Sequence, residues 1–283
     1  MSAVPGPRFT VIVAVFNGRS TVERCLDSVR AQRYPHVDLV VQDGGSTDGT
    51  AEVLRARDAE VFHWQSARDA GIYDAWNRAL PHARGDWVLF LGADDELAGP
   101  DALAEAAARL RRVPDDVLVA YGRSALVNDE GEELDVLGAP WPRSRRRLRG
   151  VMSLPHQAVF HRPALFDRFG VFDPSYRIAG DYALLARALE HADAADIGDL
   201  VVARMAHGGV STTPRNALRV LAEYRRAQRE RRLVWPGWAW IASMGRVRTR
   251  LLLWSVLGEP RARRVLDAGR RLAGGRPVWT RTA

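Results

Sequence analysis

The residues best suited to chemistry are two adjacent aspartates that directly follow the pattern of a buried strand. The stretch VLFLGADDELAG, residues 88–99, places Asp94 and Asp95 at the tip of an apolar run. Carboxylates this close raise each other's pKa and cost free energy unless a cation or a hydrogen-bonding ligand lies between them. The pair therefore predicts a ligand site, although a purely structural acidic turn has the same sequence.

A second polar turn, DGGSTDGT from Asp43 to Thr50, follows another strand pattern and opens a helix pattern. Its glycines permit a tight turn and close approach of a ligand, its backbone N–H groups suit an anion, and Thr47 or Asp48 is placed to cap the helix. The turn is not a dinucleotide fingerprint, because the first strand is followed by FNGRS rather than G-x-G-x-x-G. A P-loop is excluded because the chain contains no lysine.

Strand and helix patterns alternate through the first half and predict the sheet that holds these turns. Strands are expected at 9–15, 37–43, 60–64 and 86–91, and helices from Ser20, after Asp48, near 71–80 and near 100–112. This order predicts an α/β fold with a doubly wound, mainly parallel sheet. The carboxyl ends of its strands carry FNG, DGGSTDGT and GADD, and open α/β sheets bind ligands at that edge.

The second half predicts fewer and more varied elements. A strand at 117–122 and a turn at VNDEGEEL favour a hairpin, a helix begins at AGDYALLARALEH, and the strand DLVVARM leads into HGGVS. The five arginines between Arg143 and Arg149 either grip a phosphate or form a solvated loop.

Length and composition describe an ordinary globular chain. With 283 residues and 47% hydrophobic content, it has room for one large α/β domain with an appendage, or for two small domains. The single cysteine, Cys25, lies on an amphipathic helix pattern and has no partner for an internal disulfide, which fits a reducing compartment. Because the N-terminus lacks the pattern of a signal peptide, no export is expected and a cytoplasmic location is predicted.

The basic charge is concentrated at one end of the chain. All 41 basic residues are arginine, which resembles a genome composition effect, so no nucleic-acid partner is expected. Residues 215–283 carry a net charge of +13 and residues 1–214 a net charge of −6, with the boundary near Thr213. The tail either meets an anionic membrane surface peripherally or is a solvated helical face. Its stretch VWPGWAWIASMG is too short to span a bilayer; its tryptophans suit an interface or pack on the domain.

The motifs VIVAVFNG, QDGGSTDGT, DAGIYDAWNRAL, GDWVLFLGADDEL, HQAVFHRPALFDRFGVFD, AGDYALLARAL and GGVS occur in this order. With this set, the chain resembles the family 2 glycosyltransferases of the GT-A fold over about residues 9–212, and most closely bacterial enzymes that decorate glycolipids or polysaccharides. The resemblance implies a domain at 1–213, with a Rossmann-like donor half at about 9–122 and an acceptor half at about 123–213. Residues 214–283 are then a basic, tryptophan-containing helical tail.

The resemblance also implies a nucleotide-sugar donor site. Asp95 is expected to ligate Mg²⁺ or Mn²⁺ that bridges the diphosphate, with Asp94 on the ribose, although Ala93 stands where a strict DxD motif has its first acid. Asp43 is expected to accept a hydrogen bond from the base. The full expected donor set is Phe16, Asn17, Asp43, Gly44, Asp69, Gly71 and Asp94.

For the acceptor side, the resemblance implies that Asp181, at a helix start, is the general base of one inverting displacement. His156 and Gln157 match the family's HQ and are expected near the acceptor or the diphosphate, unless the histidine is satisfied in the core. His207 is a candidate third metal ligand. Tyr73, Asp74, Trp76 and Asn77 lie on one helix and either organise that helix or touch a sugar.

The expected activity is a metal-dependent, inverting transfer of a hexosyl or deoxyhexosyl group from a UDP-, dTDP- or GDP-linked sugar. The acceptor is a hydroxyl of a glycolipid, a polysaccharide or another lipid-linked or small molecule, in cell-envelope biosynthesis. One alternative is a sugar-1-phosphate nucleotidyltransferase, for which FNGRS is a poor first loop. Another is a degenerate membrane-surface binding module, against which the four acids Asp43, Asp94, Asp95 and Asp181 argue.

Overall fold

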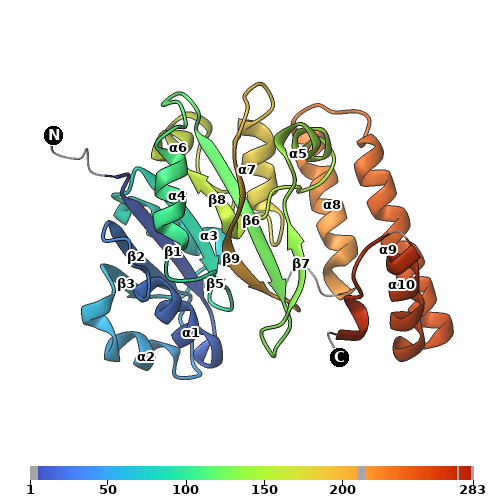
Figure 1. Ribbon diagram of the computed structural model, residues 1–283, viewed down its shortest axis with the longest axis horizontal. Helices are drawn as coiled ribbons and strands as arrows, with labels where there is room; N and C mark the ends of the chain where they lie inside the picture. The colour runs from blue at the N-terminus through green and yellow to red at the C-terminus, as the bar shows by residue number, and fades with distance from the viewer. Residues whose placement is uncertain (1–5, 210–213, 273, 282–283) are drawn as a thin grey trace.

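A computed structural model describes residues 6–209, 214–272 and 274–281, and it has one sheet with helices on both faces (Figure 1). The α/β fold expected from the alternating patterns is confirmed. The strands are β1 (Phe9–Val15), β2 (Val37–Asp43), β3 (His63–Ser66), β4 (Trp87–Gly92), β5 (Glu96–Leu97), β6 (Val119–Val127), β7 (Glu133–Leu137), β8 (Val159–His161) and β9 (Ala195–Ala206). The α-helices are α1 (Arg19–Arg30), α2 (Thr50–Ala56), α3 (Ile72–Ala79), α4 (Ala102–Leu110), α5 (Trp141–Leu148), α6 (Pro163–Phe169), α7 (Gly180–Ala188), α8 (Pro214–Glu230), α9 (Gly237–Leu257) and α10 (Glu259–Leu272).

The sheet is parallel where the expected donor half lies. Its strand order is β3-β2-β1-β4-β8-β6-β9-β5, with β7 paired to β6, and β3, β2, β1 and β4 run parallel to one another. In the other half, β6 and β9 are parallel, whereas β8, β7 and β5 pair antiparallel with their neighbours. Because Val15 pairs with Asp43 and Ala14 with Gly92, the polar turns after β1, β2 and β4 share one edge.

Alternating side chains of the strands supply two cores. On β1, Phe9, Val11 and Val13 pack with α1 and α4 on one face, while Ile12 and Ala14 pack with α3 and α7 on the other. Successive strand residues point to opposite faces, so a strand that is apolar throughout is covered on both sides. The two buried layers fix the strand ends, and with them the polar turns.

Two local expectations were wrong. The third strand begins at His63 rather than at residue 60, because residues 58–60 form a 3₁₀ turn and Asp58 accepts a hydrogen bond from the Trp64 indole at 2.6 Å. The arginines between Arg143 and Arg149 do not form a loop; helix α5 carries most of them. The expected boundary at Thr213, and the Val210 and Ser211 part of the GGVS motif, lie outside the described residues.

Helix α8 packs into the second core and joins the C-terminal helices to the sheet domain. Its residues Ala217, Leu221 and Ala227 are buried. The Gln228 side-chain amide donates to the Gly150 carbonyl at 2.8 Å, which ties α8 to the segment after α5. Figure 1 shows α8 between α7 and the outer pair α9 and α10. In the described part of the chain, no helix is both long and apolar enough to cross a bilayer.

Some of the basic charge at the C-terminus is paired within the molecule. The acidic β6–β7 hairpin receives three arginines from the last residues: Arg270 meets Asp135 at 2.7 Å, Arg276 meets Glu133 at 3.5 Å and Arg281 meets Glu132 at 2.9 Å. These pairs hold the chain end against the hairpin, so this part of the +13 charge faces carboxylates.

Candidate active site at the carboxyl edge of the sheet

Asp43, the last residue of β2, is fully buried and held by hydroxyl groups. Its carboxylate accepts hydrogen bonds from the Ser46 backbone N–H at 3.1 Å and from the hydroxyls of Ser46 and Ser66. Ser66 reaches Asp43 because β3 pairs with β2 in the register that sets these two residues side by side. The carboxylate is therefore fixed in one orientation at the edge. Sequence reasoning missed both serines, although the D-x-x-S spacing of Asp43 and Ser46 signals such a turn.

The loop after β1 carries an exposed aromatic residue at the same edge of the sheet. Phe16 is a large apolar side chain that is 67% exposed. Asn17 has φ of +49°, donates its N–H to the Ser46 hydroxyl at 2.7 Å and accepts from the Thr47 N–H at 2.9 Å. These bonds join the loop after β1, which carries Phe16, to the loop after β2, which follows Asp43.

Asp69 lies over Gly44 from the neighbouring loop. A Cβ at Gly44 would lie 2.7 Å from the Asp69 carboxylate, so only glycine permits this approach. Asp69 accepts a hydrogen bond from the Gly71 N–H at 2.9 Å, and Gly71 has φ of +123°, where a side chain is strained. Burial raises the pKa of Asp69. The loops after β2 and β3 thus meet at a carboxylate, with Gly71 leading into α3.

The paired aspartates fold back around the end of β4. Asp95 is 4% exposed and accepts a hydrogen bond from the Gly92 N–H at 3.0 Å. Burial, and next the charge of Asp94, raise the pKa of Asp95 to about 7, while hydrogen bonds from Gly92, Gln157 and Ala206 act in the opposite direction. The structure therefore places Gln157, expected near the acceptor or diphosphate, against Asp95. This costly acid pair suits a bound cation.

The acid pair offers carboxylate oxygens, the donor type that Mg²⁺ and Mn²⁺ use. Among the described residues, no group of three or more His, Cys, Asp and Glu side chains is gathered for a metal. His207, the candidate third ligand, has its ring 6.5 Å from the Trp279 ring in an edge-to-face contact, and it does not form such a group with Asp94 and Asp95. Two carboxylates suffice where substrate phosphates complete the coordination shell.

Asp181 lies in the first turn of α7 and is linked to the helix that follows Asp69. The Tyr73 hydroxyl of α3 donates to the Asp181 carboxylate at 3.2 Å. The two helices approach closely at Gly180, where a Cβ would lie 2.8 Å from the Tyr73 ring. Burial raises the pKa of Asp181 to about 6 against the hydrogen bonds from Tyr182 and Tyr73. A carboxylate with this pKa is ionised near neutrality and is more basic than an ordinary aspartate.

Glu223 of α8 holds the start of α7, and sequence reasoning missed it. Its carboxylate accepts hydrogen bonds from the backbone N–H groups of Arg177, Ile178 and Ala179 at 2.9–3.1 Å. These donors lie just before the helix and would otherwise have no intrahelical acceptor. No local pattern signals this cap, because Glu223 lies more than forty residues from the N–H groups that it binds. A residue of the expected tail therefore positions Asp181.

The remaining candidates on α3 organise the helix and its neighbours. Asp74 accepts from the Ala70 N–H at 2.9 Å and pairs with Arg78 at 2.8 Å. Asn77 exchanges two hydrogen bonds with the Phe172 backbone, at 2.7 and 3.1 Å. Trp76 is buried against aromatic rings. In this structure, Tyr73 is the α3 candidate that contacts Asp181.

His156 lies in an aromatic core. Its ring stacks on Phe90 and packs against Trp76, with centroid distances of 5.8 and 5.1 Å. Burial lowers the pKa of His156 to about 3, so the ring is neutral at physiological pH. Its Nε2 atom has no hydrogen-bond partner in the described structure. The buried, neutral ring matches the expectation of a core histidine, except that this nitrogen is unsatisfied.

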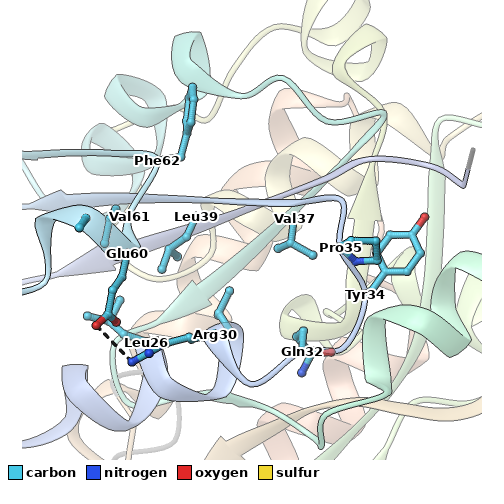
Figure 2. A pocket seen from close by; sticks show the side chains of 12 residues that line it. Leu26, Arg30, Gln32, Tyr34, Pro35, Val37, Leu39, Glu60, Val61 and Phe62 are labelled. Carbon is cyan, nitrogen blue, oxygen red and sulfur yellow. Dashed lines mark hydrogen bonds and ion pairs between the residues drawn. The ribbon is translucent and has the colours of Figure 1, made fainter.

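A hollow of about 610 Å³ lies away from these carboxylates, between α1 and the start of β2 (Figure 2). Leu26, Val37 and Leu39 line it, and Figure 2 shows Arg30 and Glu60 facing each other beside it, 3.2 Å apart. Val37 begins β2, so the hollow is at the opposite end of that strand from Asp43. Arg30 and Glu60 beside the hollow already pair with each other. The candidate aspartates lie at the opposite edge of the sheet.

Comparison with known proteins agrees with the geometry at that edge. The profile of the family described as glycosyl transferase family 2 matches residues 10–167, more than half of the chain. The chain belongs to this family. An uncharacterised glycosyltransferase of Mycobacterium tuberculosis is 37% identical over 185 residues, which are 64% of this chain and 69% of the relative. A PGL/p-HBAD biosynthesis glycosyltransferase of Mycobacterium bovis is 34% identical over 183 residues, 62% of this chain and 67% of the relative.

Solved structures share the fold of this glycosyltransferase. TarS 1–349 of S. aureus in complex with UDP has a TM-score of 0.60 at 22% identity, covering 78% of this chain and 65% of that chain, so this protein matches just under two thirds of its length. The mannosyltransferase PcManGT of Pyrobaculum calidifontis, in complex with GDP-Man and Mn²⁺, has a TM-score of 0.58 at 22% identity and covers 98% of this chain and 84% of that chain. The GT-A-type fold expected from the motifs is confirmed.

Proposed function

We propose that this family 2 glycosyltransferase transfers a sugar from a nucleoside diphosphate to an acceptor hydroxyl with inversion, in a metal-dependent reaction. The observation that carries the proposal is the meeting of Asp43, Asp69 and the Asp94–Asp95 pair at one sheet edge, with Asp181 joined to it through Tyr73. The UDP and GDP-Man complexes of the structural neighbours agree with a nucleotide-sugar donor.

On the donor side, the buried Asp43 carboxylate accepts a hydrogen bond from the nucleobase, and the exposed Phe16 ring stacks on the base. Stacking on the base would bury the exposed area of the ring and supply hydrophobic binding energy. Asp69 and Asp94 reach the nucleotide from the two neighbouring loops. The glycines at positions 44 and 71 keep the approach open.

Asp95 would hold a divalent cation, Mg²⁺ or Mn²⁺, through its carboxylate oxygens, beside Asp94 on the nucleotide. The raised pKa of Asp95 supports this role, because such a carboxylate is destabilised until a positive charge is near. When bound, the cation neutralises the charge of the diphosphate. Gln157 donates to Asp95 and keeps its carboxylate oriented.

In the chemical step, Asp181 accepts the proton of the acceptor hydroxyl while the hydroxyl oxygen forms a bond to the anomeric carbon. The bond between that carbon and the diphosphate oxygen breaks, and the electron pair leaves with the nucleoside diphosphate. One displacement inverts the anomeric configuration and requires no covalent glycosyl-enzyme. Asp181, with its pKa near 6, is ionised and basic enough to take this proton at neutral pH.

The acceptor that we propose is a hydroxyl of a glycolipid or polysaccharide of the cell envelope. The mycobacterial relative named for PGL/p-HBAD biosynthesis supports this class. The reaction would take place at the cytoplasmic face of the membrane. Neither a nucleotidyltransferase nor a binding module without catalysis receives support from the comparisons.

A screen of UDP-, dTDP- and GDP-linked sugars by thermal shift, with and without Mn²⁺, tests the proposal. A true donor at a hundredfold excess over its Kd adds about 2.7 kcal/mol of stability. We expect one nucleotide class to give this shift only with the cation, and Asp43→Ala to remove it. If every sugar nucleotide left the melting temperature unchanged, with and without Mn²⁺, the proposal would be rejected.

A further inference from the structure

Arginines without carboxylate partners gather beside the start of α9. A pocket of about 650 Å³ is bounded by α5, the α8–α9 connection and the first turns of α9. Its lining includes four arginines, Arg146, Arg147, Arg149 and Arg246. Within residues 6–209, 214–272 and 274–281, none of the four forms an ion pair; Arg246 donates to the Ser243 hydroxyl at 2.9 Å.

The unpaired charges repel one another. Burial, and then the charges of Arg246 and Arg143, lower the pKa of Arg147. Some arginines of the C-terminal helices do pair with carboxylates, as Arg231 does with Glu190 at 3.4 Å. Like charges without a counter-charge cost free energy, which a bound anion would relieve. The pocket is therefore electrostatically suited to an anion.

Exposed tryptophans form the rim of the same pocket. Trp235 is 61% exposed and Trp238 is 77% exposed, and their rings meet edge to face with centroids 5.9 Å apart. Trp240 differs, because its indole donates to the Leu221 carbonyl at 2.8 Å and anchors α9 on α8. Trp240 therefore packs against α8, whereas Trp235 and Trp238 remain at the surface. Tryptophan side chains favour the boundary between water and hydrocarbon.

From the rim, an uncharged stripe continues along the exposed face of α9. Its members are Trp238, Ala242, Gly245, Thr249, Leu252 and Val256, all exposed and spaced by three or four residues. Figure 1 shows α9 at the outer side of the molecule, beyond α8. Arg246 and Arg248 flank the stripe. Three of its members, Trp238, Leu252 and Val256, are large apolar side chains exposed to solvent, and such side chains beside arginines suit contact with a membrane surface.

We propose that this pocket binds the phosphate of an anionic phospholipid headgroup, while Trp235, Trp238 and the stripe enter the interface of the bilayer. Guanidinium groups bind phosphate oxygens in bidentate pairs, and four arginines line this pocket. The positive charge of the pocket and its apolar rim fit one ligand that has an anionic headgroup and apolar acyl chains. The site is separate from the carboxylate edge and does not depend on the proposed transfer reaction.

Vesicle sedimentation of the intact chain tests the inference. The vesicles contain phosphatidylcholine alone or phosphatidylcholine with phosphatidylglycerol. The double variant Arg147→Gln/Arg246→Gln is compared with Arg55→Gln/Arg112→Gln, which removes the same charge from exposed arginines on α2 and after α4. We expect preference for the anionic vesicles and a fall of roughly thirtyfold in their binding for the first variant, or about 1 kcal/mol per arginine. The second variant should bind as the intact chain does.

Two further measurements complete the test. Trp235→Ser/Trp238→Ser should also weaken vesicle binding, and circular dichroism should show that all variants are folded. Equal binding of the two arginine variants, or equal binding of the intact chain to both vesicle types, would overturn the proposal. Soluble glycerol phosphate is then added to protein bound on the vesicles. If it releases the protein at a concentration similar to that of the lipid needed for binding, the pocket is a site for free phosphate and the membrane assignment is wrong.

Discussion

At the scale of single residues, Asp95 is held in a site that disfavours its charge. Its folded-state pKa of about 7 lies above the ordinary value, so the folded protein binds this proton more tightly than the unfolded chain. Stability from this group is therefore present below about pH 4 and is lost as the pH rises to about 7. Such a cost is usual at functional sites, where a ligand offsets it.

This cost predicts that Asp95→Asn stabilises the metal-free protein at pH 8, by on the order of 2–4 kcal/mol, and that the gain disappears near pH 4. Urea unfolding at both pH values measures it. The control is Asp116→Asn, at an exposed position. A gain that is the same at both pH values, or that Asp116→Asn reproduces, would argue against a destabilised Asp95 carboxylate.

Asp181 predicts the pH dependence of turnover. Because its pKa is about 6, it becomes protonated as the pH falls through that value and no longer accepts a proton. We expect kcat, at saturating donor, to decrease below about pH 6, and Asp181→Asn to reduce kcat by roughly 10²–10⁴-fold. A pH series of sugar-nucleotide turnover measures both. A kcat that stays level down to pH 5 would remove Asp181 from the proton transfer.

At the scale of elements, Glu223 links α8 to the start of α7. Glu223→Ala leaves three N–H groups without their acceptor, and we expect a loss of about 1–2 kcal/mol in unfolding free energy. Since α7 carries Asp181, kcat should fall while donor affinity is kept. The Glu223 charge also raises the pKa of Asp181, so the acid limb of kcat should move to lower pH in Glu223→Gln. An unmoved limb and unchanged kcat would reduce Glu223 to a structural cap.

Much of this element scale follows from local sequence. Apolar runs of strand length at β1, β2 and β4 predicted the parallel half, because strands covered on both faces are apolar throughout. The predicted start of β3 at residue 60 was wrong, because the strand begins where it pairs with β2, at His63. The same pairing brings Ser66 beside Asp43. Helix α5 was not predicted because half of its residues are arginines. Only Trp141, Ser144 and Leu148 pack toward the core, which is too few to give a clear helical pattern.

The candidate site was predictable to a similar degree. The aspartates after β2 and β4 are recognised by their place at strand ends, where a parallel sheet brings its loops together. The partners that hold them, such as Ser66, Gln157 and Glu223, come from distant segments and have no local signature. The aromatic core around His156 likewise depends on side chains from several elements.

At the scale of the whole molecule, the chain end closes on the β6–β7 hairpin. Asp267 is buried and accepts the backbone N–H groups of Val278, Trp279 and Thr280 at 2.8–3.0 Å, while Val278 packs with Leu134. Asp267→Ala should release this end, lower the unfolding free energy by about 1–3 kcal/mol and speed amide exchange in the hairpin. Exchange mass spectrometry measures this. Protection identical to that of the unmodified protein would show that the arginine pairs alone hold the end.

The central claim is that one carboxylate edge binds a nucleoside diphosphate through a cation and that Asp181 acts on the acceptor. A calorimetric titration of the nucleoside diphosphate selected by the thermal-shift screen, in Mn²⁺, tests it most directly when three proteins are compared: the unmodified chain, Asp95→Asn and Asp181→Asn. The account predicts binding by the unmodified chain and by Asp181→Asn with similar affinity, and a large loss for Asp95→Asn. Full affinity in Asp95→Asn, or a loss in Asp181→Asn equal to it, would contradict the account.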